Sequence, residues 1–150
     1  MYVSDLSVNY ETLSGDVHAL ENVDFQLEDN ESIGIAGESG CGKSTLGLSI
    51  IKMIQGGKII AGEITLGEKS ILNMSESEFD DIIRWKEISM VFQGAMNSLD
   101  PVFTIEQQFD QILKQHNFTD DFKKTMHNLL DTVSLSHSIL KKYPHELSGG

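Results

Sequence analysis

The chain contains the stretch Gly37-Glu38-Ser39-Gly40-Cys41-Gly42-Lys43-Ser44-Thr45, which matches the pattern G-x-x-x-x-G-K-[ST] at every position. Glycines let such a loop turn tightly, so that its backbone N–H groups point inward and surround an anion. Lys43 adds a positive charge that can reach the β- and γ-phosphates, and the Ser44 hydroxyl is a ligand for Mg²⁺. We therefore interpret residues 37–45 as a phosphate-binding P-loop for a nucleoside triphosphate with Mg²⁺. Glu38 and Ser39 fall at variable positions, where the backbone donors matter more than the side chains.

The segments on both sides of this loop have the character that a P-loop requires. Residues 32–36 form a short, mostly small or apolar run, which predicts a buried strand. Residues 44–53 are apolar on most sides, which predicts a buried helix whose positive end points at the bound phosphates. A chance glycine-rich turn between two buried elements would not account for Lys43 and Ser44 in their required places.

Length and composition indicate one soluble globular domain. The chain has 150 residues, of which 39% are hydrophobic and 23% charged. Its net charge of −12 argues against a nucleic-acid partner, because no basic patch is available to neutralise phosphates. The only cysteine, Cys41, excludes an internal disulfide and a C-x-x-C metal site. We find no signal peptide and no apolar run long enough to cross a bilayer, so we expect a cytoplasmic protein without direct membrane insertion.

The rest of the chain predicts antiparallel strands before the P-loop unit and helices after it. Alternating or short apolar segments predict strands at residues 1–10, 17–27, 61–66 and 87–92. Capping signals and helical spacing predict helices at residues 75–84, 105–116, 120–132 and 136–142. No apolar strand ends in the second acidic motif (Walker B) that a P-loop ATPase uses to hold Mg²⁺ and the attacking water, since Asp24 and Asp100 lie in other contexts. The five histidines show no metal-binding spacing, and we expect them on the surface.

Three further pieces, together with the P-loop, resemble the nucleotide-binding subunit of an ABC transporter. The sequence Met-Val-Phe-Gln at residues 90–93 resembles the Q-loop, and Leu147-Ser148-Gly149-Gly150 matches the LSGG signature. Tyr10 stands where the family places an aromatic residue that stacks on adenine. The text at residues 93–101 and 143–147 is especially similar to the oligopeptide and dipeptide import branch. The resemblance covers essentially the whole chain, with the motifs in the family's order.

The resemblance implies an α/β fold: an incomplete P-loop NTPase core with an N-terminal antiparallel β-subdomain and a C-terminal helical subdomain. The implied division is residues 1–97, ending just after the Q-loop, and residues 98–150. In this interpretation ATP and Mg²⁺ are the cofactors, Lys43 and Gln93 are catalytic, and Ser44 and Gln93 hold Mg²⁺. The residues that bind the nucleotide are Tyr10, all of residues 37–45, and Ser148, Gly149 and Gly150, which face the nucleotide of a second subunit. An ordinary strand aromatic at Tyr10 and a strand-end hydrogen-bonding residue at Gln93 remain the alternatives.

The resemblance also implies partners and a place in the cell. They are the transmembrane permease subunits of an importer and a second ATP-binding subunit packed head to tail, with the protein held peripherally on the inner face of the membrane. The carried solute, most simply a peptide, is chosen by other subunits. Two rival interpretations are a non-catalytic nucleotide-binding or regulatory module that ends naturally here, and a P-loop kinase or GTPase. The second leaves residues 90–93 and 147–150 unexplained.

The sequence departs from the family at its end, because it stops at Gly150 inside the signature. The Walker B motif and the switch histidine of the family would lie beyond this point, so we expect an N-terminal fragment of a longer ATPase. We expect it to hydrolyse ATP poorly, to expose apolar surface and to associate. Alkylation of Cys41 in the P-loop is expected to block nucleotide binding, unless Cys41 is simply a tolerated residue at a variable position.

Overall fold

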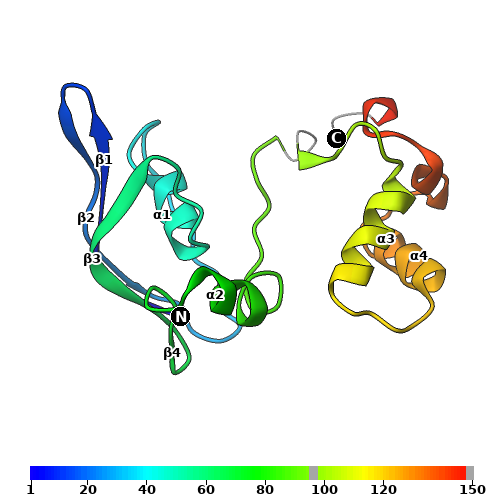
Figure 1. The fold of residues 1–150 in the computed structure, drawn as a ribbon, viewed down its shortest axis with the longest axis horizontal. Helices are drawn as coiled ribbons and strands as arrows, with labels where there is room; N and C mark the ends of the chain where they lie inside the picture. Colours follow the sequence, from blue (N-terminus) through cyan, green and yellow to red (C-terminus); the bar gives the residue numbers. More distant parts are fainter. Residues whose placement is uncertain (95–97, 148–150) are drawn as a thin grey trace. The chain divides into compact units, whose positions relative to one another are not determined.

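The computed structural model of the chain describes residues 1–94 and 98–147. The chain forms two compact units, residues 1–90 and residues 91–150 (Figure 1). Each unit has its own hydrophobic core, and we describe the two separately.

The first unit is built on an antiparallel sheet of four strands in the order β2-β1-β3-β4. The strands are β1 (Tyr2–Thr12), β2 (Gly15–Gln26), β3 (Gly57–Leu66) and β4 (Lys69–Ser70). β1 and β2 form a hairpin, and β3 pairs with the other edge of β1. The antiparallel character predicted for the start of the chain is confirmed, although β3 begins earlier than the expected residue 61.

An irregularity in the middle of β1 sets which of its side chains are buried. Val3 and Leu6 are both fully buried although they are an odd number of residues apart, which a regular strand does not allow. The register shifts between them because β1 carries an extra residue, and Asp5 adopts a left-handed φ of 50°. Gly62 of β3 lies against this bulge, where a Cβ atom would stand 2.5 Å from the Leu6 Cα.

Two helices, α1 (Lys43–Ile50) and α2 (Glu76–Ile82), cover the same face of this sheet (Figure 1). α2 begins at the predicted capping box, in which the Ser75 hydroxyl accepts from the Glu78 N–H and the Glu78 carboxylate accepts from the Ser75 N–H. α1 ends at Ile50, three positions before the predicted limit at Met53. The buried core between helices and sheet consists of Val3, Leu6, Val8, Leu20, Leu46, Ile64, Ile71, Phe79 and Ile83.

Two predictions of buried strands are wrong. Residues 32–36 and 87–92 form no strand, and the only bridge near them joins Arg84 to Ile88. Ile35 is 53% exposed and Val91 is 88% exposed. A strand requires a hydrogen-bonded neighbour, and no strand in the described part of the chain pairs with either segment. An apolar run indicates a tendency to be buried, but it does not supply the neighbour.

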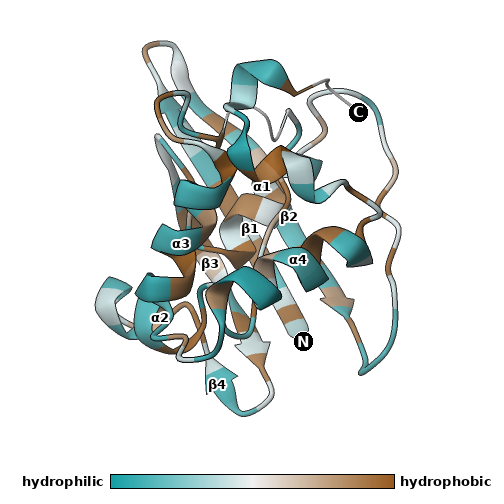
Figure 2. Cartoon of the chain, turned by 90° about the vertical axis from the view of Figure 1, so that its right-hand side faces the viewer, coloured by the Kyte–Doolittle hydropathy of each residue, from teal (hydrophilic) through white to brown (hydrophobic). Residues whose placement is uncertain are grey.

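The second unit is helical, as predicted. Its described residues include α3 (Ile105–Gln115), α4 (Phe122–Thr132) and the 3₁₀ segments η2 (His137–Lys141) and η3 (Pro144–Glu146). α3 begins at a second capping box, formed by Thr104 and Gln107. Figure 2 shows α3 and α4 banded with hydrophobic and hydrophilic residues, as expected of helices with one buried face. The buried core of this unit consists of Ile105 and Leu113 of α3, Met126 and Leu130 of α4, and Leu140 of η2. No helix in the described residues is long and apolar enough to cross a membrane.

Candidate functional site: the P-loop

The P-loop is shaped by two glycines with left-handed backbone. Gly40 has φ 84° and Gly42 has φ 92°, and residues other than glycine rarely adopt such backbone angles. Gly42 also lies directly on β2, because a Cβ atom at this position would stand only 2.5 Å from the carbonyl oxygen of Ala19. The sheet therefore fixes where the loop ends and where α1 begins.

The N-terminus of α1 faces no capping side chain. Gly42 is the N-cap, and no side chain of the described chain accepts a hydrogen bond from the first turn. The N–H groups of that turn therefore keep the capacity to bind an anion, and the helix dipole favours negative charge at this end. Ser44, in the first turn, is exposed. Its hydroxyl fits Mg²⁺, which usually takes few protein ligands beside phosphate oxygens and water.

The Lys43 ammonium is held inside the loop. Its Nζ donates to the carbonyl oxygens of Gly37 (2.8 Å) and Glu38 (2.6 Å), and it lies 3.3 Å from the Cys41 Sγ. These acceptors, two backbone carbonyls and one thiol, are all part of the P-loop, so the loop holds a positive charge against its own backbone. The Lys43 ammonium can donate to phosphate oxygens instead of these carbonyl oxygens when a phosphate binds.

Tyr10 of β1 lies next to the first turn of α1. Its hydroxyl is 3.5 Å from the Thr45 Oγ1, so the fold brings together two predicted site residues that are far apart in sequence. Its ring packs against Gly57, where a Cβ atom would stand 2.8 Å from the Tyr10 Cε1. The stacking of Tyr10 on adenine stays a prediction.

The remaining predicted site residues, Gln93 and residues 148–150, fall in the sequence range of the second unit. Gln93 belongs to the second unit and is exposed in a turn, while the P-loop belongs to the first unit. Ser148, Gly149 and Gly150 lie outside the described residues. Among the described residues no group of three or more His, Cys, Asp or Glu side chains could hold a metal ion.

Sequence reasoning missed two residues that shape the site. Ala19 presents the carbonyl group on which Gly42 rests, and Gly57 leaves the space that the Tyr10 ring fills. A backbone carbonyl leaves no trace in a sequence pattern. A glycine pair after a predicted helix, as at residues 56–57, indicates only a break in the chain, and the pattern does not reveal the contact with Tyr10.

The comparison with family models matches residues 20–150 to the family described as "ABC transporter". The matched segment includes the P-loop and the whole second unit.

Curated relatives point to one branch of that family. The chain is 39% identical over 140 residues to the oligopeptide transport ATP-binding protein AppD of Bacillus subtilis, covering 89% of the chain and 42% of the relative. It is 35% identical over 153 residues to OppD of Escherichia coli, covering 99% of the chain and 45% of the relative. It is 36% identical to the dipeptide transport ATP-binding protein DppD of Lactococcus lactis, covering 99% and 44%. The chain thus spans less than half the length of these relatives.

Solved structures agree on the fold. The dimeric structure of the bacterial ABC transporter cassette MJ0796 superposes with a TM-score of 0.82 at 24% identity, covering 99% of this chain and 63% of that one. A post-hydrolysis state of the same cassette, bound to ADP and phosphate, gives a TM-score of 0.84. Together with the described elements, this identifies the chain as an α/β portion of the ABC cassette fold.

Proposed function

Since this chain belongs to the ABC transporter family, we propose that it binds ATP with Mg²⁺ as part of the ATP-binding subunit of a peptide importer. The observation that carries the proposal is the P-loop geometry. Gly42 rests on β2, α1 starts with an uncapped turn, and the Lys43 ammonium stands among the carbonyl groups of the loop. A triphosphate needs many donors in a small space, and this arrangement supplies them.

Each part of the loop has a separate role in the proposed complex. The backbone N–H groups of residues 37–45 surround the phosphates, and Lys43 exchanges the carbonyl oxygens of Gly37 and Glu38 for phosphate oxygens. The Ser44 hydroxyl is a ligand of Mg²⁺, which neutralises phosphate charge when bound. Tyr10, already next to Thr45, stacks on the adenine ring.

The remaining roles require the whole protein. We assign Gln93 to Mg²⁺ and the attacking water, and Ser148, Gly149 and Gly150 to the nucleotide of a second subunit packed head to tail. Hydrolysis of ATP by that assembly then drives solute import through permease subunits, which hold the protein at the inner face of the membrane. The oligopeptide and dipeptide transport names of the relatives support a peptide as the solute.

Calorimetric titration of the 150-residue chain with Mg-ATP tests the proposal directly. We expect binding by the native chain and loss of that binding in Lys43→Ala, because the variant lacks the ammonium at the centre of the loop. Lys114→Ala is the matched control, since Lys114 pairs with Asp110 on α3 of the second unit and should not affect the P-loop. Equal affinities in the native chain and Lys43→Ala would refute nucleotide binding by this loop.

A further inference from the structure

The P-loop helix α1 is weak as an isolated helix. It has only eight residues, below the length at which isolated helices are stable in water. Gly47 lies in its interior, and Thr45 and Ile50 are β-branched, so its intrinsic helix propensity is low. α1 is therefore held by contacts with the rest of the first unit, and Leu46 packs from its middle into the buried core. The contact of Gly42 with β2 fixes the end that carries the P-loop, and the far end needs a support of its own.

The far end of α1 is closed by a Schellman motif in which lysine takes the place of the usual glycine. The Lys52 N–H donates to the Ser49 carbonyl (3.1 Å), and the Met53 N–H donates to the Leu48 carbonyl (2.8 Å). Lys52 has a left-handed φ of 53°, a conformation that costs a non-glycine residue about 1–2 kcal/mol. A glycine would form this turn without that cost, which suggests that the lysine side chain has a role here.

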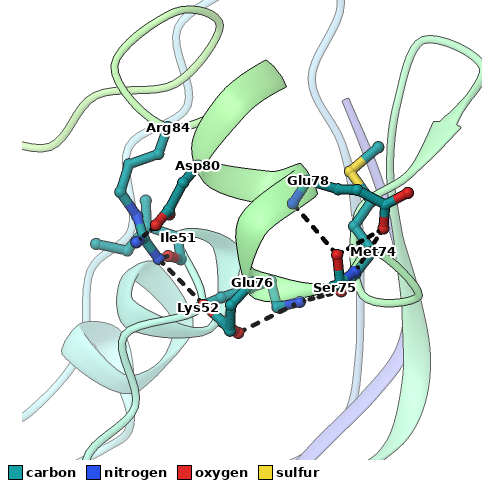
Figure 3. A network of polar contacts seen from close by, with 8 residues as sticks. All are labelled: Ile51, Lys52, Met74, Ser75, Glu76, Glu78, Asp80 and Arg84. Carbon is teal, nitrogen blue, oxygen red and sulfur yellow. Dashed lines mark hydrogen bonds and ion pairs between the residues drawn. The ribbon is translucent and has the colours of Figure 1, made fainter. Parts of the chain in front are cut away.

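The Lys52 side chain ties the end of α1 to the start of α2 (Figure 3). Its Nζ donates to the Met74 carbonyl at 2.7 Å and lies 3.5 Å from the Glu76 carboxylate. The Lys52 side chain is only 14% exposed whereas that of Glu76 is 68% exposed, so the hydrogen bond to Met74 is the better shielded of the two contacts.

Arg84, which follows α2, also contacts the C-terminal end of α1 (Figure 3). Its Nη2 donates to the Ile51 carbonyl at 3.2 Å, while Nη1 binds the Asp80 carboxylate and Nη2 also lies 3.7 Å from Glu76. The Arg84 Nε is buried and makes no hydrogen bond within the described part of the chain. The guanidinium is therefore kept in this place although one of its donors finds no acceptor among these residues.

Both cations also contact the fully buried ring of Phe79. The Lys52 Nζ lies 5.5 Å and the Arg84 guanidinium carbon 5.1 Å from the ring centroid. Positive charges at this place also favour the C-terminal end of the α1 dipole. Phe79 of α2 thus lies beside two cations, Lys52 at the end of α1 and Arg84 just after α2.

We propose that Arg84 and Lys52 are positioning residues for nucleotide binding: by holding the C-terminal end of α1 on α2, they fix the angle at which its N-terminal end presents Lys43 and Ser44. The inference rests on the proposed function. It adds that the affinity for the phosphates depends on the contacts that Lys52 and Arg84 make at the C-terminal end of α1. α1 transmits the constraint because it is short and anchored at both ends.

The test compares variants of the 150-residue chain by Mg-ATP calorimetry and by urea unfolding. Arg84→Met removes the donors but keeps most of the apolar stem, and we expect the Kd to rise by roughly three- to thirty-fold, the range of long-range coupling. Arg84→Lys keeps the charge near Asp80 and Phe79 but loses the forked donation, so its Kd should be intermediate. Lys69→Met is the matched control, because Lys69 forms an exposed pair with Glu87 in the same unit without touching α1.

A merely structural role makes a different prediction. In that case Arg84→Met would lower the urea midpoint while the Kd of the folded protein stayed at the native value, and this result would overturn the proposal. A loss of affinity in Lys69→Met equal to that in Arg84→Met would also overturn it, because the effect would then be one of general charge. If Arg84→Met does not fold, a native Kd in Arg84→Lys has the same consequence. Absence of Lys43-dependent binding in the native chain would overturn the proposed function itself, and this inference with it.

Discussion

At the scale of single residues, Gly42 bears two constraints at once. Its φ of 92° disfavours any side chain, and a Cβ atom would collide with the Ala19 carbonyl at 2.5 Å. We therefore expect Gly42→Ala to cost about 1–3 kcal/mol of unfolding free energy and to weaken Mg-ATP binding as α1 shifts away from β2. Urea unfolding and calorimetry measure the two effects.

Gly34 supplies the control for that substitution. It precedes the P-loop, has no left-handed φ, and a Cβ atom there would meet nothing within 4 Å. Gly34→Ala should therefore change the unfolding free energy by no more than about 0.5 kcal/mol and leave nucleotide affinity unchanged. If both variants behaved alike, the contact between Gly42 and β2 would not be what orients the loop.

At the scale of elements, the start of α2 should depend on pH. The Ser75 N–H (2.9 Å) and the Ser75 hydroxyl (2.8 Å) donate to the Glu78 carboxylate and lower the pKa of Glu78 below its ordinary value. Because the pKa is lower in the folded state, this stabilisation is fully present above the ordinary glutamate pKa. It is lost as the pH falls from the ordinary glutamate pKa through the lower, folded-state pKa.

Glu78→Gln isolates that effect. The capping box of α3 uses Gln107 in the same position with respect to Thr104, so a glutamine can make the same backbone contact without titrating. We expect the native chain to be more stable than Glu78→Gln at neutral pH, and the difference in thermal midpoint to shrink as the pH is lowered. A difference that stayed constant across this range would show that the Glu78 charge contributes nothing to the box.

Elements with a complete local signal were predictable from the sequence, and those that need a distant partner were not. Ser75 and Glu78 carry their own capping chemistry, so the start of α2 was predicted correctly. The P-loop was recognisable because every donor in it is local. The burial of Leu6 depends on a bulge at Asp5 that fits Gly62 on another strand, and no spacing within β1 reveals such a fit.

The contacts of Lys52 and Arg84 at the end of α1 also depend on distant partners, so they could not be predicted from the sequence. Lys52 and Arg84 appear in the sequence as ordinary charged residues, and only the fold places both on Phe79. The predictions of strands at residues 32–36 and 87–92 were wrong because the local signal is present but the neighbouring strand is not, among the residues that the structure describes. Their apolar composition is a real property of the sequence, but a strand exists only beside another strand.

At the scale of the whole molecule, those two segments leave apolar side chains exposed to water on a chain with a large net negative charge. Ile33 and Ile35 are exposed just before the P-loop, and Val91 and Phe92 are exposed at the other segment. Apolar association is opposed by repulsion between chains of net charge −12. Salt screens that repulsion over about 10 Å at 0.1 M, so we expect self-association to increase with salt as well as with protein concentration.

Multi-angle light scattering at low and moderate salt measures this association. The double variant Ile33→Thr/Ile35→Thr should associate less than the native chain at the same concentration, because it removes exposed apolar area without changing the charge. Ile112→Thr, at an exposed position on α3, is the control and should associate like the native chain. A native chain that is monomeric at every salt concentration would mean that the exposed residues before the P-loop are too few to drive association. Association that weakens with salt would instead point to charged contacts, which the apolar segments do not provide.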